Sequence, residues 1–222
     1  MKTEKFDILY IDPPWKYNTR RNSKTKFGLG MSRYDGMTLQ ELCDLPVRKI
    51  TQPNAAAFVW VTSPALKRRH PAETPQRYLF ELAEAWGLYY VAKAFCWVKI
   101  AKDGSPRLLP GYYTGSNTED CFLLVKGKMP VADKGVNQIV FNELGKQSEK
   151  PNEVRERITR LYPKARKLEM FARCYTPGWV SWGNETVNCP LQDAVRLRPY
   201  EAYTPPEQAR QKLLFTNGGC QI

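Results

Sequence analysis

The stretch that decides the fold is F-D-I-L-Y-I-D-P-P-W, residues 6–15. Its apolar half, Phe6 to Ile11, has the composition of a buried strand, and the two prolines after Asp12 end that strand because proline cannot donate to a ladder. In a parallel sheet, ligands bind beyond the carboxyl ends of the strands. The stretch therefore predicts a buried strand that carries Asp12 to a ligand site.

Strand and helix patterns alternate along the rest of the chain. Thr38 and Glu41 have capping-box spacing before a short helix, and Gly87 is placed to end a longer one. This alternation predicts an α/β fold, with a mostly parallel sheet and helices on both faces. The predicted strands are 6–11, 55–61, 89–98, 120–125, 138–141, 167–171 and 179–182, and the longer predicted helices are 76–86 and 151–161.

The chain has 222 residues, which suits one sizeable domain. We predict a catalytic domain over residues 1–185. Periodicity is lost after Asn184, and four prolines follow, so residues 186–222 are expected to form a tail.

The charge balance is strongly basic. Lys and Arg number 34 against 22 Asp and Glu, which gives a net charge of +12 and a pI of about 9.4. Such an excess favours binding to phosphate backbones, with simple solubility as the alternative. Two clusters in loops after predicted strands are expected to flank the same rim as Asp12 and to contact the substrate: Arg20 and Arg21 with Lys24, and Lys67, Arg68 and Arg69.

Other classes of site find little support. The six cysteines have no C-x-x-C spacing and only one histidine accompanies them, which argues against a metal site. The first apolar run is too short for a signal peptide or a membrane span, so we expect a cytoplasmic protein. No G-x-G-x-x-G follows the first strand, which argues against a dinucleotide-binding oxidoreductase.

The tetrapeptide D-P-P-W suits chemistry at the exocyclic amine of a base. The lone pair of that amine is delocalised into the ring, and acceptors aimed at its N–H bonds localise the pair. The Asp12 carboxylate and the Pro13 carbonyl could serve as acceptors, while Trp15 could stack on the base. A sulfonium methyl donor would also gain from a nearby carboxylate. The alternative is a strand-ending turn with Trp15 in the core.

Several motifs in order resemble the MT-A70 adenine methyltransferases, a family that includes the catalytic subunit of the mRNA adenosine methyltransferase and many small bacterial and phage enzymes. The resemblance covers residues 6–185. Its motifs are D-P-P-W at 12–15, F-V-W-V-T at 58–62, E-D-C-F-L-L-V-K-G at 119–127, E-K-P-N-E-V at 149–154, R-K-L-E-M-F-A-R at 166–173 and G-W-V-S-W-G-N-E at 178–185.

The resemblance implies a Rossmann-like S-adenosylmethionine-dependent methyltransferase that modifies the N6 amine of adenine. Asp12 and Pro13 then match the acceptors for the amine, with Asp12 also close to the ammonium of the donor, and Pro14 and Trp15 match the walls of the base pocket. Lys150 matches a lysine that pairs with the donor carboxylate. Further cofactor positions are Glu169, Arg173, Asn184 and Glu185, and weaker candidates for the adenine pocket are Tyr34 and Glu119.

The residues leave several alternatives open. The substrate could be DNA, which the small bacterial and phage relatives favour, or RNA, since the same pocket accepts either sugar. The domain could instead be a silent nucleic-acid-binding scaffold, and a homodimer is a further expectation. Lys150 could be solvated, and Glu169 could form a surface ion pair with Arg173. The chain departs from the family at 174–176 and at Glu185.

Overall fold

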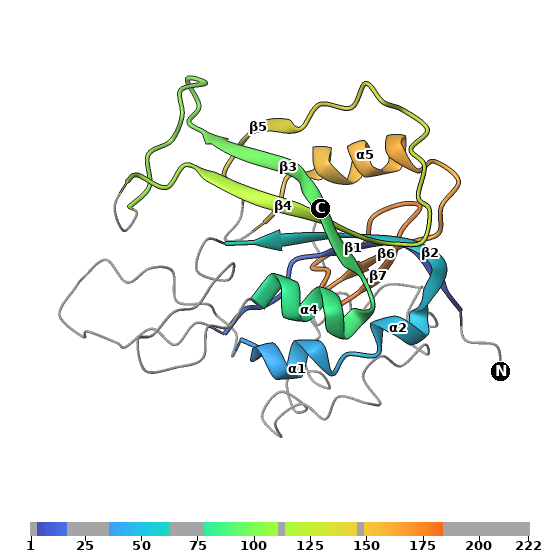
Figure 1. Cartoon of the computed structure of the whole chain (residues 1–222). Coiled ribbons are helices and arrows are strands. Elements are labelled where there is room, and N and C mark those ends of the chain that lie inside the picture. Colours follow the sequence, from blue (N-terminus) through green and yellow to red (C-terminus); the bar gives the residue numbers. More distant parts are fainter. Residues whose placement is uncertain (1–3, 17–35, 63–77, 111–113, 146–148, 184–222) are drawn as a thin grey trace.

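The computed structural model describes residues 4–16, 36–62, 78–110, 114–145 and 149–183. Within these residues, seven strands form one sheet in the order β5-β3-β4-β2-β1-β6-β7 (Figure 1). The strands are β1 (Phe6–Ile11), β2 (Thr51–Val61), β3 (Tyr89–Ile100), β4 (Thr118–Lys126), β5 (Ile139–Glu143), β6 (Lys167–Met170) and β7 (Val180–Trp182).

The sheet is mostly parallel, as predicted. Strand β1 pairs in parallel with β2 and β6, β6 with β7, and β3 with β5. Strand β4 is antiparallel to both of its neighbours, β2 and β3. The sequence between β3 and β4 carries no helical pattern, and without a crossover helix consecutive neighbouring strands return antiparallel. The carboxyl end of β1 and the amino end of β4 therefore meet at one edge.

Helices cover both faces, which confirms that part of the prediction. Helices α1 (Leu39–Cys43), α2 (Val47–Ile50) and α4 (Tyr78–Trp86) lie on one face, and α5 (Asn152–Leu161) lies on the other (Figure 1). Each face has its own apolar cluster: Leu42 and Leu82 pack on Val59 in one, while Val154 and Ile158 belong to the other. The short helix α2 was not predicted from the sequence.

Local signals set the ends of the helices. Thr38 caps α1, and a reciprocal hydrogen bond from its backbone N–H to Glu41 completes the predicted capping box. Gly87 has a φ of 71°, and the N–H groups of Gly87 and Leu88 donate to the carbonyls of Glu84 and Ala83, the Schellman pattern that ends α4. The sequence predicted that Pro151 is the first helical residue of α5, but it is the N-cap.

The segment before α1 holds D-P-P-W in place. Residues Trp15 and Met37 form an isolated parallel bridge, and the Met37 N–H donates to the Pro14 carbonyl at 2.6 Å. A Cβ on Gly36 would lie 2.8 Å from the Trp15 carbonyl oxygen, so this approach requires glycine. These contacts tie the D-P-P-W residues to the segment that leads into α1.

Candidate active site

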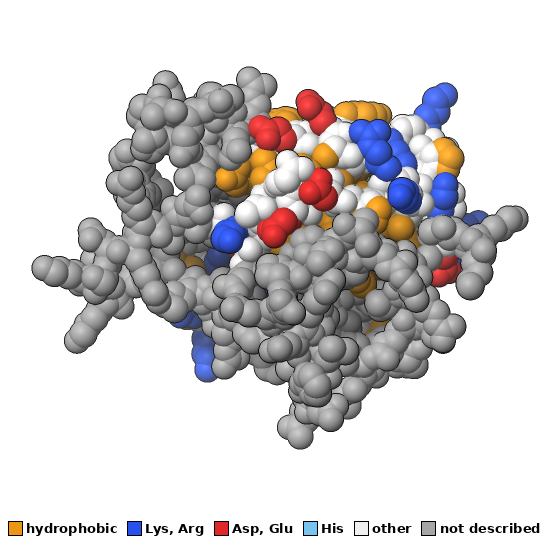
Figure 2. Space-filling view, turned by 90° about the horizontal axis from the view of Figure 1, so that it is seen from below, with side chains coloured by type: hydrophobic (Ala, Val, Ile, Leu, Met, Phe, Trp, Pro, Cys, Tyr) orange, Lys and Arg blue, Asp and Glu red, His pale blue; other side chains and the backbone are white. Residues whose placement is uncertain are grey.

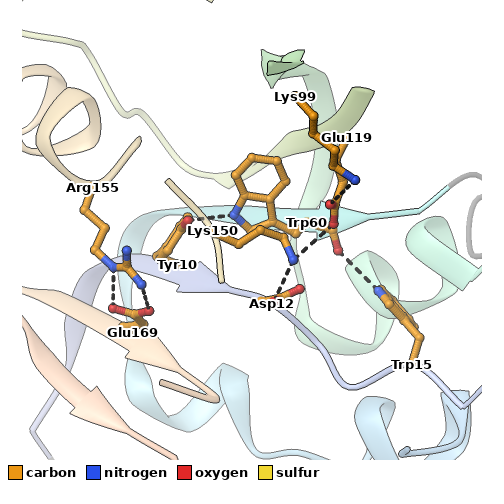
Figure 3. Close-up of polar contacts among 9 residues, drawn as sticks. All are labelled: Tyr10, Asp12, Trp15, Trp60, Lys99, Glu119, Lys150, Arg155 and Glu169. Carbon is orange, nitrogen blue, oxygen red and sulfur yellow. Dashed lines mark hydrogen bonds and ion pairs between the residues drawn. The ribbon is translucent and has the colours of Figure 1, made fainter. Parts of the chain in front are cut away.

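A buried ion pair lies at the carboxyl end of β1. Asp12 directly follows this strand, and Lys150 directly precedes Pro151, the N-cap of α5. The Lys150 Nζ atom lies 2.8 Å from Asp12 Oδ2 (Figure 3). The lysine side chain is 7% exposed and that of Asp12 is 29% exposed. Lys150 is therefore not the solvated residue of the alternative interpretation, and Asp12 retains access to solvent.

The pair belongs to a chain of four alternating charges. Lys150 Nζ also lies 3.0 Å from Glu119 Oε1, and Glu119 Oε2 lies 3.3 Å from Lys99 Nζ. Glu119 is the second residue of β4 and is partly buried, while Lys99 stands near the end of β3 and lies over the Trp97 ring. Two carboxylates and two ammonium groups give the chain no net charge, which reduces the cost of burying them.

The pKa values follow from burial and from this alternation. Burial raises the pKa of the Asp12 carboxyl, and Lys150 only partly offsets that rise. Burial also acts to raise the pKa of Glu119, but Lys150 and Lys99 outweigh it and the pKa is lowered. For Lys150, burial acts to lower the pKa, and the two carboxylates outweigh it and raise the pKa. The two carboxylates therefore favour the charged form of Lys150.

The D-P-P-W residues form a tight, largely closed turn. The backbone N–H of Trp15 donates to the Pro13 carbonyl at 2.8 Å. A carbonyl oxygen has two lone pairs, so it can accept a second hydrogen bond. The Trp15 ring is 6% exposed, its Nε1 donates to the Trp60 carbonyl at 3.2 Å, and it stacks on Tyr78 at 6.2 Å. Trp15 thus belongs to the apolar core of its face, and its part in a base pocket stays a prediction.

Glu169 lies in the second buried ion pair. Both of its carboxylate oxygens accept hydrogen bonds from Arg155, at 2.7 and 2.5 Å, and the Glu169 side chain is 6% exposed. Arg155 also donates to Asn152 and lies over the Tyr10 ring. Glu169 is therefore not the surface residue of the alternative interpretation, because it is buried and pairs with Arg155. A cofactor contact by Glu169 stays a prediction.

Arg173 stands on the same edge, after the end of β6. Its charge acts against the rise in the pKa of Asp12, although burial outweighs it. Two residues earlier, Phe171 has a φ of 60°, a region that non-glycine residues rarely adopt, and its ring contacts that of Trp182 at 5.2 Å. Strained backbone of this kind gathers at functional sites.

Several predicted site residues lie outside the described part of the chain: Tyr34, Arg20, Arg21, Lys67, Arg68, Arg69, Asn184 and Glu185. The predicted tail, 186–222, also lies outside it. In the described ranges, His, Cys, Asp and Glu side chains form no group of three or more that could hold a metal ion. None of the helices described is long and apolar enough to span a membrane.

Sequence reasoning missed four residues of this region: Tyr10, Trp60, Lys99 and Arg155. One of them, Arg155, carried a usable signal. Arg155 sits beside Val154 on the buried side of α5, and Glu169 interrupts a buried strand, so each charge needed a partner. The pairing itself depends on how α5 packs against β6.

The mostly parallel sheet, the helices on both faces and the charged cluster after β1 together define an α/β protein with a candidate ligand site beyond the carboxyl end of β1. The MT-A70 family model matches residues 6–185, and the chain belongs to the MT-A70 family.

Three named proteins are similar to this chain in sequence. The type II methyltransferase M.MunI of a Mycoplasma species is 32% identical over 82% of this chain and 78% of its own length. The human N(6)-adenine-specific methyltransferase METTL4 is 29% identical over 82% of this chain, which spans 38% of that protein. The human N(6)-adenosine-methyltransferase catalytic subunit METTL3 is 26% identical over 85% of this chain and 30% of its own length.

Proposed function

We propose that this protein transfers a methyl group from S-adenosylmethionine to the exocyclic N6 amine of adenine in DNA. The observation that carries the proposal is the partly exposed Asp12 carboxylate at the end of β1, held through one oxygen by the buried Lys150 in a chain of the MT-A70 family. The position is the one at which open parallel sheets bind ligands.

The charged side chains of the cluster suit a methyl donor that carries both positive and negative groups. S-adenosylmethionine has an ammonium, a carboxylate and a sulfonium, and the cluster offers the carboxylate of Asp12 beside the cations Lys150 and Arg173. When bound, it supplies an electrophilic methyl group on sulfur. We assign Lys150 to the donor carboxylate, and we place Arg173, Glu169, Asn184 and Glu185 toward the adenosine end.

The protein itself prepares the amine. The Asp12 carboxylate and the Pro13 carbonyl accept hydrogen bonds from the two N–H bonds, so that the nitrogen lone pair points at the methyl group. With the donor bound, the nitrogen would take its methyl group, the electron pair of the carbon–sulfur bond would stay on sulfur, and the methylated amine would lose a proton to solvent. Pro14 and Trp15, with Tyr34 and Glu119, are assigned to hold the base, and alignment at near-attack distance lowers the barrier further.

DNA is favoured over RNA because the Mycoplasma relative is a type II methyltransferase that this chain matches over most of both lengths. The net charge of +12 supports a polyanionic substrate of either kind. We assign phosphate contacts to Arg20, Arg21, Lys67, Arg68 and Arg69, and a homodimer remains part of the proposal.

The test is to express the protein and an Asp12→Ala variant in a host that lacks adenine methylation, and to digest DNA and RNA separately to nucleosides. We expect N6-methyladenine in DNA from the wild type and none with the variant. Methylated adenosine in RNA alone would transfer the proposal to RNA. If neither nucleic acid is modified and labelled donor does not bind, the chain is a non-catalytic scaffold.

A further inference from the structure

Trp60 contacts the D-P-P-W turn, the Lys150 ammonium and the buried Tyr10 side chain. Trp60 lies in β2 and is 1% exposed. Its carbonyl accepts the hydrogen bond from Trp15, its Nε1 donates to the Tyr10 hydroxyl at 2.7 Å, and Lys150 Nζ lies 5.5 Å from its ring centre (Figure 3). The D-P-P-W turn, through the Trp60 carbonyl, and the ion pair and the interior of the sheet, through the Trp60 indole, therefore meet at one residue.

The plane of this indole is fixed by its neighbours. The hydroxyl of Tyr10 accepts this hydrogen bond, and the Tyr10 ring lies 5.2 Å from the guanidinium of Arg155 and edge-on to Trp179 at 6.0 Å. Trp97 packs edge-on against Trp60 itself at 6.4 Å. If the indole turned, its buried N–H would lose its acceptor, which carries a full desolvation penalty.

The fixed position of the Trp60 ring matters because the ring faces the Lys150 ammonium. A lysine side chain has four flexible carbons, so ion pairs at its tip do not by themselves define where the stem lies. The face of a tryptophan attracts a cation most strongly among the aromatic rings. The Trp60 ring thus forms a wall on one side of the ammonium, while Asp12 and Glu119 hold it on others.

We propose that Trp60 is a positioning residue of this site: its ring, held in plane by the Tyr10 hydroxyl, keeps the Lys150 ammonium on Asp12 and Glu119. Trp60 acts through Lys150 and not on the reacting atoms. The effect on methyl transfer rests on the proposed function, whereas the effect on the Lys150 and Asp12 pair does not.

The direct test is a titration of the free protein. Carboxyl carbons are followed by NMR against pH, with the Asp12 signal assigned from an Asp12→Asn variant. We expect Trp60→Phe to raise the pKa of Asp12 by on the order of half a unit or more, because the displaced ammonium of Lys150 lowers that pKa less. Tyr10→Phe, which keeps its ring and loses only the hydroxyl, should produce a smaller rise. Glu119 and Arg173, the other charges facing Asp12, are retained in both variants.

Two matched variants serve as controls. Trp86→Phe removes an equally buried indole whose Nε1 donates to the Leu42 carbonyl at 2.9 Å, away from Lys150. Tyr162→Phe removes a hydroxyl that donates to the Met129 carbonyl at 3.3 Å. Both should lower the melting temperature and leave the Asp12 titration unchanged. The proposal is overturned if Asp12 titrates as in the wild type in Tyr10→Phe and in a folded Trp60→Phe.

Donor binding gives the second measurement. By calorimetry with S-adenosylmethionine, we expect Trp60→Phe to bind roughly two- to thirtyfold more weakly than Trp86→Phe, the range that cation–π contacts span. In kinetics, KM for the donor should rise more than kcat falls. If the wild type binds no donor and methylates no adenine, the proposed function fails, and the Asp12 titration still decides whether Trp60 positions Lys150.

Discussion

Lys150 Nζ lies 2.8 Å from Asp12 Oδ2, although 138 positions separate the two residues in the sequence. The contact joins the end of the first strand to the residue just before the α5 N-cap. It engages the Oδ2 oxygen of the Asp12 carboxylate. The predictions below ask what each partner of this contact contributes.

Asp12→Ala should abolish methyl transfer and leave the fold intact, because the carboxylate lies at an open strand end. The expected loss is at least ~100-fold in kcat, the scale for removing one preorganised charge-stabilising group. Turnover of adenine-containing DNA, with melting as the check on folding, measures it. Asp7→Ala, at the other end of β1, removes a carboxylate that accepts from the Arg166 N–H and should keep normal turnover. Near-normal activity in purified Asp12→Ala would show that the catalytic assignment is wrong.

Lys150→Ala should weaken donor binding more than it slows saturated turnover. A charge pair with the donor carboxylate persists unchanged as the methyl moves, so it contributes uniform binding energy of about 1 to 3 kcal/mol. Calorimetry with the donor is the measurement, and Lys128→Ala, at an exposed lysine, is the control. An unchanged dissociation constant would remove Lys150 from the donor site.

Glu119→Gln should destabilise the protein at neutral pH and much less in acid. The folded pKa of Glu119 lies below its ordinary value of 4.5, so its stabilisation is present above that value and is lost as pH falls through the folded pKa. We expect a loss of about 1 to 3 kcal/mol at pH 7, measured by urea unfolding, because Lys99 and Lys150 lose a charged acceptor.

The control for this variant is Glu143→Gln, at an exposed residue ending β5. It should change stability little at either pH. A deficit in Glu119→Gln that stayed equally large well below pH 4.5 would mean that the carboxylate charge is not the source of the stabilisation.

Arg155→Met should cost about 3 to 5 kcal/mol, the range for breaking a buried ion pair, because Glu169 is left charged without its bidentate partner. The double variant Arg155→Met with Glu169→Leu should recover part of that loss, since no unpaired charge then remains. Urea unfolding of the four members of the cycle gives the coupling. Strictly additive losses would show that the two side chains do not interact in solution.

Binding to DNA should depend strongly on salt, and it should weaken when either basic loop cluster is neutralised. Each lost phosphate contact should reduce the slope of log affinity against log salt by about one unit. The two triple variants replace Lys67, Arg68 and Arg69, or Arg20, Arg21 and Lys24, by alanine. The matched triple replaces three exposed lysines, Lys5, Lys49 and Lys128, at the opposite ends of the inner strands from Asp12. Figure 2 shows that Lys and Arg side chains gather at one end of the described face.

The matched triple variant should retain most of the slope of log affinity for DNA against log salt. Single-stranded or mismatched DNA should be modified more readily than a perfect duplex, since less pairing is lost when the base leaves the stack. If affinity were flat across salt, or if all three triples behaved alike, the basic excess would serve solubility and the DNA would bind elsewhere.

The sequence by itself determined most of the strands, the longer helices and the place of Asp12. These depend on local patterns: apolar runs, prolines that end a strand, and capping residues such as Thr38 and Gly87. The order of motifs also determined the family, which the family model confirms over residues 6–185.

The tertiary structure alone decided which charges meet. Glu119 lies between Lys150 and Lys99, and Glu169 lies on Arg155, and the sequence predicted neither pairing. Burying a charge requires a partner, and the sequence can show that need. The identity of the partner depends on packing, because β4 inserts antiparallel beside β2 and α5 crosses the opposite face from α4. The Trp60 ring under Lys150 follows from that same packing, and no local pattern contains it.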